Sequence, residues 1–193
     1  HGRGLALTEA GQVLRERAAP LLHGIASLRD EMRGLTGQVS GAVSIGLPWL
    51  LLERLSAALA RHFTMAFQKQ QALALLFVDM DDFKSVNDSK GHACGDHCLQ
   101  QLAHILRSVL GSNDVLGRYG GEEFMIVLPG QDEARALQVA ERLRACVEAS
   151  RVQWQEQAVS LTISVGVAVR LPQEQVPTAA LERADRALYA AKH

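Results

Sequence analysis

The sequence of 193 residues is poor in cysteine, in net charge and in long apolar segments, and each shortage argues against a class of protein. Three cysteines form no complete disulfide framework, so we expect reduced thiols in a cytoplasmic protein. The formal net charge of −1 does not give the basic surface of a nucleic-acid-binding protein, so we expect no nucleic acid partner. No apolar run is long enough to cross a bilayer and no secretory signal is present, so we expect no membrane contact.

The sequence does contain enough apolar material for a hydrophobic core. Hydrophobic residues make up 48% of it and charged residues 21%, a balance typical of soluble globular proteins. The length suits one domain of ordinary size with an additional segment. We therefore expect a helical extension in residues 1–46, which ends in a glycine-containing linker, and a single domain in residues 47–193.

The N-terminal segment carries a heptad pattern with two interpretations. Apolar residues alternate at spacings of four and three, which is the pattern of a helix with one apolar seam. They are Leu14, Ala18, Leu21, Ile25, Leu28, Met32 and Leu35. Such a helix either packs on its own domain or pairs with a second copy, although Pro20 and Gly24 weaken it. Residues 1–46 resemble the linker helix of LysR-type transcription regulators, which pairs two subunits, in the strings LTEAG and LRDEMRGLTGQVSGAVSIG.

The remaining segments alternate between strand and helix patterns in the order β-α-β-β-α-β, after a first helix in residues 49–61. The four expected strands cover residues 72–79, 115–118, 123–128 and 161–169, and the helices cover 95–110, 132–150 and 178–192. This order predicts an α+β domain of the ferredoxin-like, split-βαβ type with a mostly antiparallel central sheet. We expect Gly120 and Gly121 to form the tight hairpin turn with positive φ angles.

Carboxylates gather where two of these strands begin or end. Asp79, Asp81 and Asp82 follow the first apolar strand, and Glu122 and Glu123 follow the hairpin glycines. In this strand order the first strand can lie beside the hairpin, so an aspartate and a glutamate would face each other across a short gap. Oxygen ligands in such a gap suit Mg²⁺, and two such ions can stabilise both oxygens of a phosphoryl displacement. The alternative to a metal site is that these carboxylates only cap strand ends exposed to solvent.

Several spaced motifs together resemble the GGDEF family of diguanylate cyclases. The strings FVDMDDFKSVNDSKGHACGD and GRYGGEEF are followed by LTISVGVA and RADRALYAAK, in the family's order over residues 47–193. The resemblance implies a palm-type sheet like that of nucleotide polymerases and class III nucleotidyl cyclases. It also implies condensation of two GTP molecules into cyclic di-GMP with release of pyrophosphate, by a homodimer that uses two Mg²⁺ or Mn²⁺ ions in each domain.

The resemblance also assigns roles to individual residues. The metal ligands are Asp79, the backbone carbonyl of Met80, and Glu122, which also helps to deprotonate the attacking 3′-hydroxyl. Glu123 and Lys84 complete the catalytic set, with Lys84 as a charge partner of the phosphates. The remaining residues are assigned to the substrate: Phe83, Gly120, Gly121 and Lys192 near the phosphates, Asn87 and Asp96 at guanine, and His92 beside the nucleotide.

Three departures from the family pattern favour weakened activity or feedback. The family's opening D-x-L-T-G-L-x-N-R-R motif is only partly matched by Gly46, Leu47 and Pro48, because Ala42 replaces its aspartate and Trp49 follows. The arginine of the R-x-x-D product-inhibition motif is replaced by Gly111, three residues before Asp114. The family's C-terminal G-R-N stretch is not matched. The alternative function is therefore a weakened GGDEF module that binds GTP or cyclic di-GMP as a signalling receptor.

Overall fold

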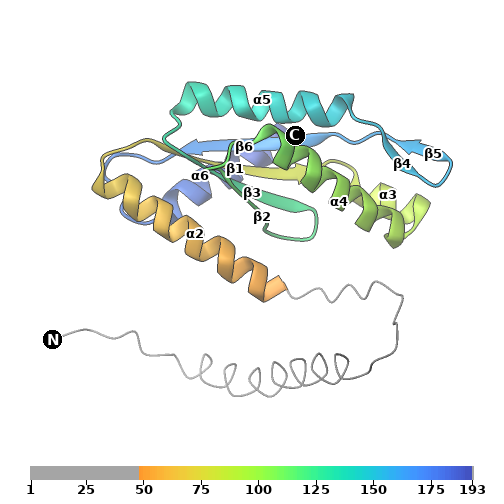
Figure 1. Cartoon of the computed structure of the whole chain (residues 1–193), viewed down its shortest axis with the longest axis horizontal. Helices are drawn as coiled ribbons and strands as arrows, with labels where there is room; N and C mark the ends of the chain where they lie inside the picture. Colours follow the sequence, from red (N-terminus) through yellow and green to blue (C-terminus); the bar gives the residue numbers. More distant parts are fainter. Residues whose placement is uncertain (1–47, 193) are drawn as a thin grey trace, which may run out of the picture. The chain divides into compact units, whose positions relative to one another are not determined.

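A computed structural model describes residues 48–192, and the side chains from residue 55 onward, so the heptad seam and the LysR-like segment lie outside the described residues (Figure 1). The described residues form one compact unit. Its helices are α2 Pro48–Gln68, α3 Phe83–Lys90, α4 His92–Val109, α5 Glu133–Ala149 and α6 Thr178–Lys192. Its strands are β1 Leu73–Met80, β2 Val115–Arg118, β3 Glu123–Pro129, β4 Val152–Trp154, β5 Gln157–Val159 and β6 Ile163–Val169.

Four strands form an antiparallel sheet in the order β2-β3-β1-β6. This order confirms the α+β, split-βαβ architecture, because β3 lies between β2 and β1 and each helical crossover skips one strand. Strand β1 is central, and every one of its residues is buried. A strand that is covered on both faces has no polar side to present, which explains its continuous apolar run Leu73–Val78.

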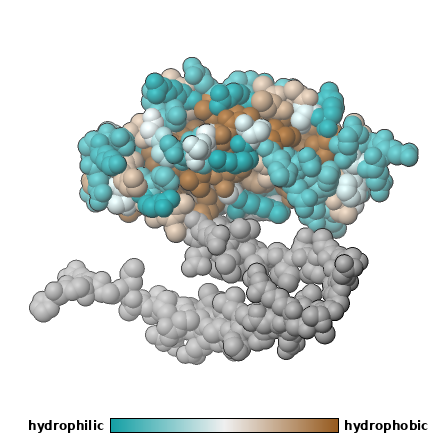
Figure 2. Space-filling model, viewed as in Figure 1, coloured by the Kyte–Doolittle hydropathy of each residue, from teal (hydrophilic) through white to brown (hydrophobic). Residues whose placement is uncertain are grey.

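Side-chain alternation along β1 divides the core into two layers. Ala74, Leu76, Val78 and Met80 belong to the core cluster that includes residues of α4 and α5. Leu73, Leu75 and Phe77 belong to the cluster that includes residues of α2 and α6. Figure 1 shows α5 and α2 on opposite sides of the sheet, and apolar residues form a band between polar outer surfaces in Figure 2. Asp79 therefore stands on the α2/α6 side of the sheet, at the end of β1.

Three local features differ from the sequence-based expectations. Helix α2 continues to Gln68, beyond the periodic stretch that ends at residue 61. Helix α3 was not predicted, because it has only eight residues, none of them fully buried, and Phe83 and Val86 are the two that pack on the core. The β4–β5 hairpin was also missed, since its strands have three residues each and its turn depends on Gln155 at φ 53°.

In the part of the chain that the structure describes, no helix combines the length and apolar character that crossing a membrane requires.

Candidate active site

The strand-end carboxylates are brought together by the register of the sheet. Asp79 of β1 lies opposite Glu123 of β3, and the Met80 amide donates to the Glu122 carbonyl at 3.3 Å. Directly opposed residues in an antiparallel pair have neighbouring Cβ atoms on the same face. The expected proximity of Asp79 to the hairpin glutamates is thus confirmed, with Glu123 as the directly opposed residue.

Asp79 is a buried carboxylate with one cationic partner. Its residue exposure is 5%, and Lys192 of α6 places Nζ 2.7 Å from Oδ1. This contact is an ion pair without hydrogen-bond geometry, because Oδ1 is buried and has no hydrogen-bond partner. A buried carboxylate oxygen without a donor is unfavourable unless a cation compensates its charge. Lys192, which the sequence assigned to the triphosphate, compensates Asp79 in this arrangement.

The neighbouring Glu123 is electrostatically crowded. Burial, and then the negative charges of Asp79 and Glu122, raise the pKa of Glu123, while Lys192 acts in the opposite direction. Glu123 thus has three negative neighbours, Asp79, Glu122 and Asp185, against one lysine, an excess of negative charge that a divalent cation would offset. The oxygen donors of Asp79 and Glu122 fit a Mg²⁺ ion in their chemistry. Among the described side chains, however, no group of three His, Cys, Asp or Glu is placed to hold a metal ion by itself.

The turn before β3 is closed by backbone hydrogen bonds. The amides of Tyr119 and Gly120 both donate to the Glu123 carbonyl, at 2.8 and 3.2 Å. The expectation of positive φ angles at Gly120 and Gly121 was wrong, because the glycines with positive φ in the described chain are Gly91 and Gly130. A Cβ on Gly120 would lie 2.2 Å from Glu123 Oε2, so a larger residue there would displace the end of the Glu123 side chain. A Cβ on Gly121 would meet no atom within 4 Å, so the space beside it is open.

The two residues assigned to guanine lie where α3 meets α4. Gly91, at φ 82°, is the single residue between these helices. Asn87 of α3 lies against Gly95 of α4, where a Cβ would be 2.0 Å from Asn87 Oδ1. That oxygen is buried and has no hydrogen-bond partner, and Asp96 is the next residue along α4 and is exposed. An unpaired buried amide oxygen beside an exposed carboxylate is an arrangement that a polar ligand could complete.

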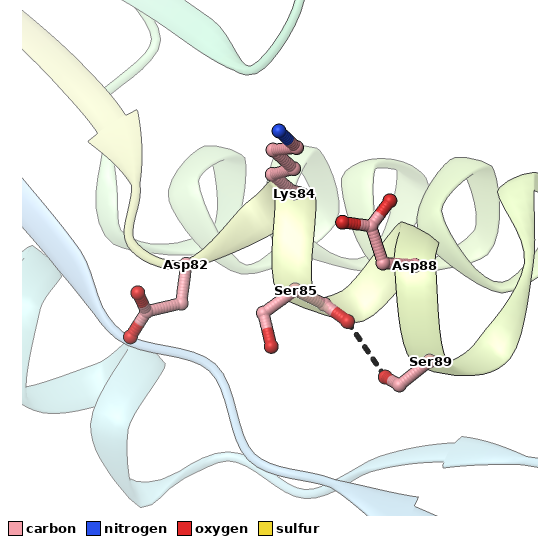
Figure 3. A pocket seen from close by; sticks show the side chains of 5 residues that line it. All are labelled: Asp82, Lys84, Ser85, Asp88 and Ser89. Atoms are coloured by element: carbon pink, nitrogen blue, oxygen red, sulfur yellow. Dashed lines mark hydrogen bonds between the residues drawn. The ribbon is translucent and has the colours of Figure 1, made fainter.

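Phe83, Lys84 and His92, which the resemblance also assigned to the substrate, lie on the same pair of helices. Phe83 begins α3 and packs on the core beside Gly95, and His92 begins α4 and is exposed. Lys84 is exposed and lines an open surface depression of about 510 Å³ together with Asp82, Ser85, Asp88 and Ser89. Figure 3 shows Lys84 and Asp88 extending to one side of α3 and Asp82 to the other, with the Ser89 hydroxyl bound to the Ser85 carbonyl. The depression includes neither Asn87 nor Asp96.

Several contacts around the site were not anticipated from the sequence. The Ser164 hydroxyl of β6 donates to Asp81 Oδ1 at 2.7 Å, which fixes the chain just after β1. Lys90 donates to Gln157 of the β4–β5 hairpin, and the His97 ring lies against Trp154. Each contact joins residues far apart in the sequence, so no local pattern could have identified it.

The segment at Gly111–Asp114 is closed on itself. The Gly111 amide donates to Asp114 Oδ2 at 2.8 Å, and Arg107 donates to the carbonyls of both residues at 3.0 Å. The Asp114 carboxylate, which the motif would offer to a ligand, is therefore already bonded within the loop.

The chain thus combines a split-βαβ sheet with carboxylates at the end of β1 and the start of β3. Residues 51–193 match the family described as "Diguanylate cyclase, GGDEF domain". The chain belongs to this family. Diguanylate cyclase A of Treponema denticola is 38% identical over 125 residues, which cover 65% of this chain and 34% of that protein. The chain thus spans about a third of the length of this curated relative.

Solved structures agree with this assignment. The GGDEF domain of DgcB from Caulobacter crescentus, in complex with c-di-GMP, is 30% identical and superposes with a TM-score of 0.70, over 73% of this chain and 84% of that chain. The active GGEEF domain of a diguanylate cyclase from Vibrio cholerae is 33% identical, with a TM-score of 0.69 over 72% and 88% of the two chains. The matches named here do not show the expected resemblance of residues 1–46 to the LysR-type linker helix.

Proposed function

We propose that residues 47–193 form a diguanylate cyclase domain, which condenses two GTP molecules into cyclic di-GMP and releases two pyrophosphates. The observation that carries this proposal is the register that sets Asp79 beside the GGEEF glutamates. Membership of the GGDEF family and the names of the relatives support it.

In this proposal Asp79, the Met80 carbonyl and Glu122 hold Mg²⁺ or Mn²⁺. A bound divalent ion supplies charge stabilisation for the phosphoryl transfer. Asp79 pairs with Lys192 at 2.7 Å, so metal binding at Asp79 would release Lys192 for the triphosphate. The single lysine would then compensate the buried carboxylate in the empty domain and the phosphates in the loaded one.

The proposed chemistry is an in-line displacement at each α-phosphorus. The 3′-oxygen of one GTP forms a bond to the α-phosphorus of the other, and the bond from that phosphorus to the pyrophosphate oxygen breaks. Glu122 helps to accept the 3′-hydroxyl proton, and Glu123 and Lys84 complete the catalytic set. Two such steps close the ring and release two pyrophosphates.

Guanine recognition is assigned to Asn87 and Asp96. A carboxylate can accept from guanine N1–H and the 2-amino group, and an amide can meet O6 or N3. The unpaired Asn87 Oδ1 supports this assignment, since a ligand donor would satisfy it. Phe83, His92 and the two signature glycines would border the nucleotide.

We also propose that the active species is a homodimer. Each domain carries one Gly-Gly-Glu-Glu-Phe signature, residues 120–124, and one pair of residues assigned to guanine, Asn87 and Asp96. Each domain therefore holds one GTP, whereas the product contains two guanylates. Two domains must therefore meet around a two-fold axis. The heptads of residues 14–35 would raise the effective concentration of one domain near the other.

The dimer proposal predicts activity that depends on protein concentration. Leu21→Lys combined with Leu28→Lys places charges in the heptad seam, so specific activity should fall at dilute protein and recover in part at high concentration. Activity assays and sedimentation over a dilution series measure this. Flat specific activity for parent and double mutant, both sedimenting as monomers, would exclude the dimer.

A GTP-binding or cyclic di-GMP-binding module without turnover is the second candidate. The ion pair of Lys192 with Asp79 favours it, because the lysine occupies an oxygen that a metal needs. Incubating the protein with GTP and Mg²⁺, followed by chromatography, separates the two candidates. The cyclase accumulates cyclic di-GMP and pyrophosphate, whereas the binding module returns GTP unchanged.

A further inference from the structure

Arg118, the last residue of β2, clamps the turn that precedes β3. Its guanidinium donates from Nε to the carbonyls of Gly120 and Gly121, at 3.2 and 3.0 Å, and from a second nitrogen to the Gly121 carbonyl. Arg118 is exposed and forms no ion pair among the described residues, so its hydrogen bonds to the turn are not a by-product of charge pairing.

The clamp determines where the neighbouring amides point. In a planar trans peptide the C=O of one residue and the N–H of the next point in opposite directions. Because the carbonyls of Gly120 and Gly121 both point towards Arg118, the amides of Gly121 and Glu122 both point away from it. Neither amide donates a hydrogen bond within residues 48–192, whereas the amides of Tyr119 and Gly120 are bonded to Glu123.

Two successive free amides on one side of a turn form a concave anion site. Gly121 leaves that side open, since no heavy atom lies within 4 Å of where its Cβ would be. We propose that Arg118 is a positioning residue, which aims the Gly121 and Glu122 amides at a phosphate group of the bound nucleotide without touching that nucleotide itself. This inference rests on the proposed function, because the phosphate belongs to the GTP of that reaction.

The planar fork of arginine is essential to this role. A guanidinium presents several N–H groups in fixed directions and can hold two carbonyls at once, whereas the lysine ammonium is a point charge on a flexible stem. Arg118→Lys should therefore keep the charge and lose the clamp. If Arg118 instead attracted the phosphate by its charge, the lysine variant would behave like the parent.

The test compares a ligand with phosphates and a ligand without them. We would measure the affinities of 3′-deoxy-GTP, which cannot be cyclised, and of guanosine, in the presence of Mg²⁺. Arg118→Lys and Arg118→Gln should lower the affinity for 3′-deoxy-GTP about tenfold, which is the effect of losing well-aimed hydrogen bonds to a charged group. The affinity for guanosine should stay within about twofold of the parent value. Arg151→Gln is the matched control, because exposed Arg151 also donates to two backbone carbonyls, at the end of α5, and should change neither affinity.

Backbone NMR supplies a second readout. On addition of 3′-deoxy-GTP, the Gly121 and Glu122 amide resonances should shift in the parent and in Arg151→Gln, and remain near their free positions in Arg118→Lys. Parent-like binding by Arg118→Lys, equal losses for both ligands, or nucleotide binding without a response of these amides would each overturn the inference while leaving the cyclase proposal standing. A parent that neither binds 3′-deoxy-GTP nor forms cyclic di-GMP would overturn the proposed function, and this inference with it.

Discussion

The two halves of the candidate site are held in place by different means. Asp79 and Glu123 face each other from two paired central strands, in a sheet whose β1 residues are all buried. Asn87 stands on α3, none of whose residues is buried, and it meets α4 through the small residue Gly95. The carboxylate half is therefore fixed by the core, whereas the guanine half depends on a few local contacts. Substitutions in the first half should change chemistry, and those in the second should change recognition.

The largest effect is expected at Glu122. Glu122→Gln removes a charge from the proposed metal site and keeps the side-chain shape, so turnover should fall by about a hundredfold or more while the fold is preserved. Cyclic di-GMP formation and circular dichroism measure the two outcomes. Glu156→Gln, at the exposed turn of the β4–β5 hairpin, is the control and should retain parent turnover. Parent-like synthesis by Glu122→Gln would remove the basis for the catalytic assignment.

A smaller effect, on recognition, is expected from Gly95→Ala. The new Cβ would lie 2.0 Å from Asn87 Oδ1, so Asn87 must move. We expect GTP to bind about tenfold more weakly, since an unpaired guanine group costs about 1–3 kcal/mol. The parent should prefer GTP over ATP by about tenfold for the same reason, and the variant should lose this preference. Stability should change less than with a backbone clash, because the atoms nearest the new Cβ belong to the Asn87 and Phe83 side chains, and alanine is favoured over glycine inside a helix by up to about 1 kcal/mol. Calorimetry with both nucleotides and thermal unfolding measure these effects.

Gly166 provides the matched test of the comparison. A Cβ on Gly166 of β6 would lie 2.2 Å from the Ala184 carbonyl oxygen and 2.3 Å from the Leu188 amide nitrogen, both in the backbone of α6. Gly166→Ala should therefore lower the free energy of unfolding by about 1–3 kcal/mol through overpacking. If Gly95→Ala lost stability and Gly166→Ala did not, the proposed division between core and local contacts would be wrong.

The smallest effect concerns the pH dependence of stability. Burial and the charges of Asp79 and Glu122 raise the pKa of Glu123, so the folded state holds its proton more tightly than the unfolded state does. Stability linked to this group therefore falls as the pH rises from the ordinary glutamate pKa through the raised one. Glu123→Gln should melt a few degrees above the parent at pH 7, with the difference vanishing below about pH 4. A variant that melts below the parent at pH 7 would contradict the crowding of charges at this position.

The sequence predicted those parts of the fold that periodicity encodes. The continuous apolar run ending at Val78 indicated a strand, and the strand order predicted that an aspartate at its end lies near a hairpin glutamate. The register was not predictable, because shifting the pairing of β1 and β3 by one residue would place Glu122 instead of Glu123 opposite Asp79. The Lys192–Asp79 pair was not predicted, because it depends on how α6 packs beside the distant strand β1. The hydrogen bonds of Arg118 were not predicted either, because they depend on the backbone conformation of the adjacent turn.

The central claim is that Asp79 serves a metal-dependent reaction and is more than an ion-pair partner that attaches α6 to β1. The most direct test is a Mg²⁺ titration of cyclic di-GMP formation by the parent, Asp79→Asn and Lys192→Met, with thermal unfolding of each protein. We predict Mg²⁺-dependent synthesis by the parent and none by Asp79→Asn at any Mg²⁺ concentration, with Asp79→Asn folded and Lys192→Met weakened mainly in apparent GTP affinity. Parent-like synthesis by Asp79→Asn, with only the loss of stability that Lys192→Met also shows, would reduce the pair to a structural contact and contradict the account.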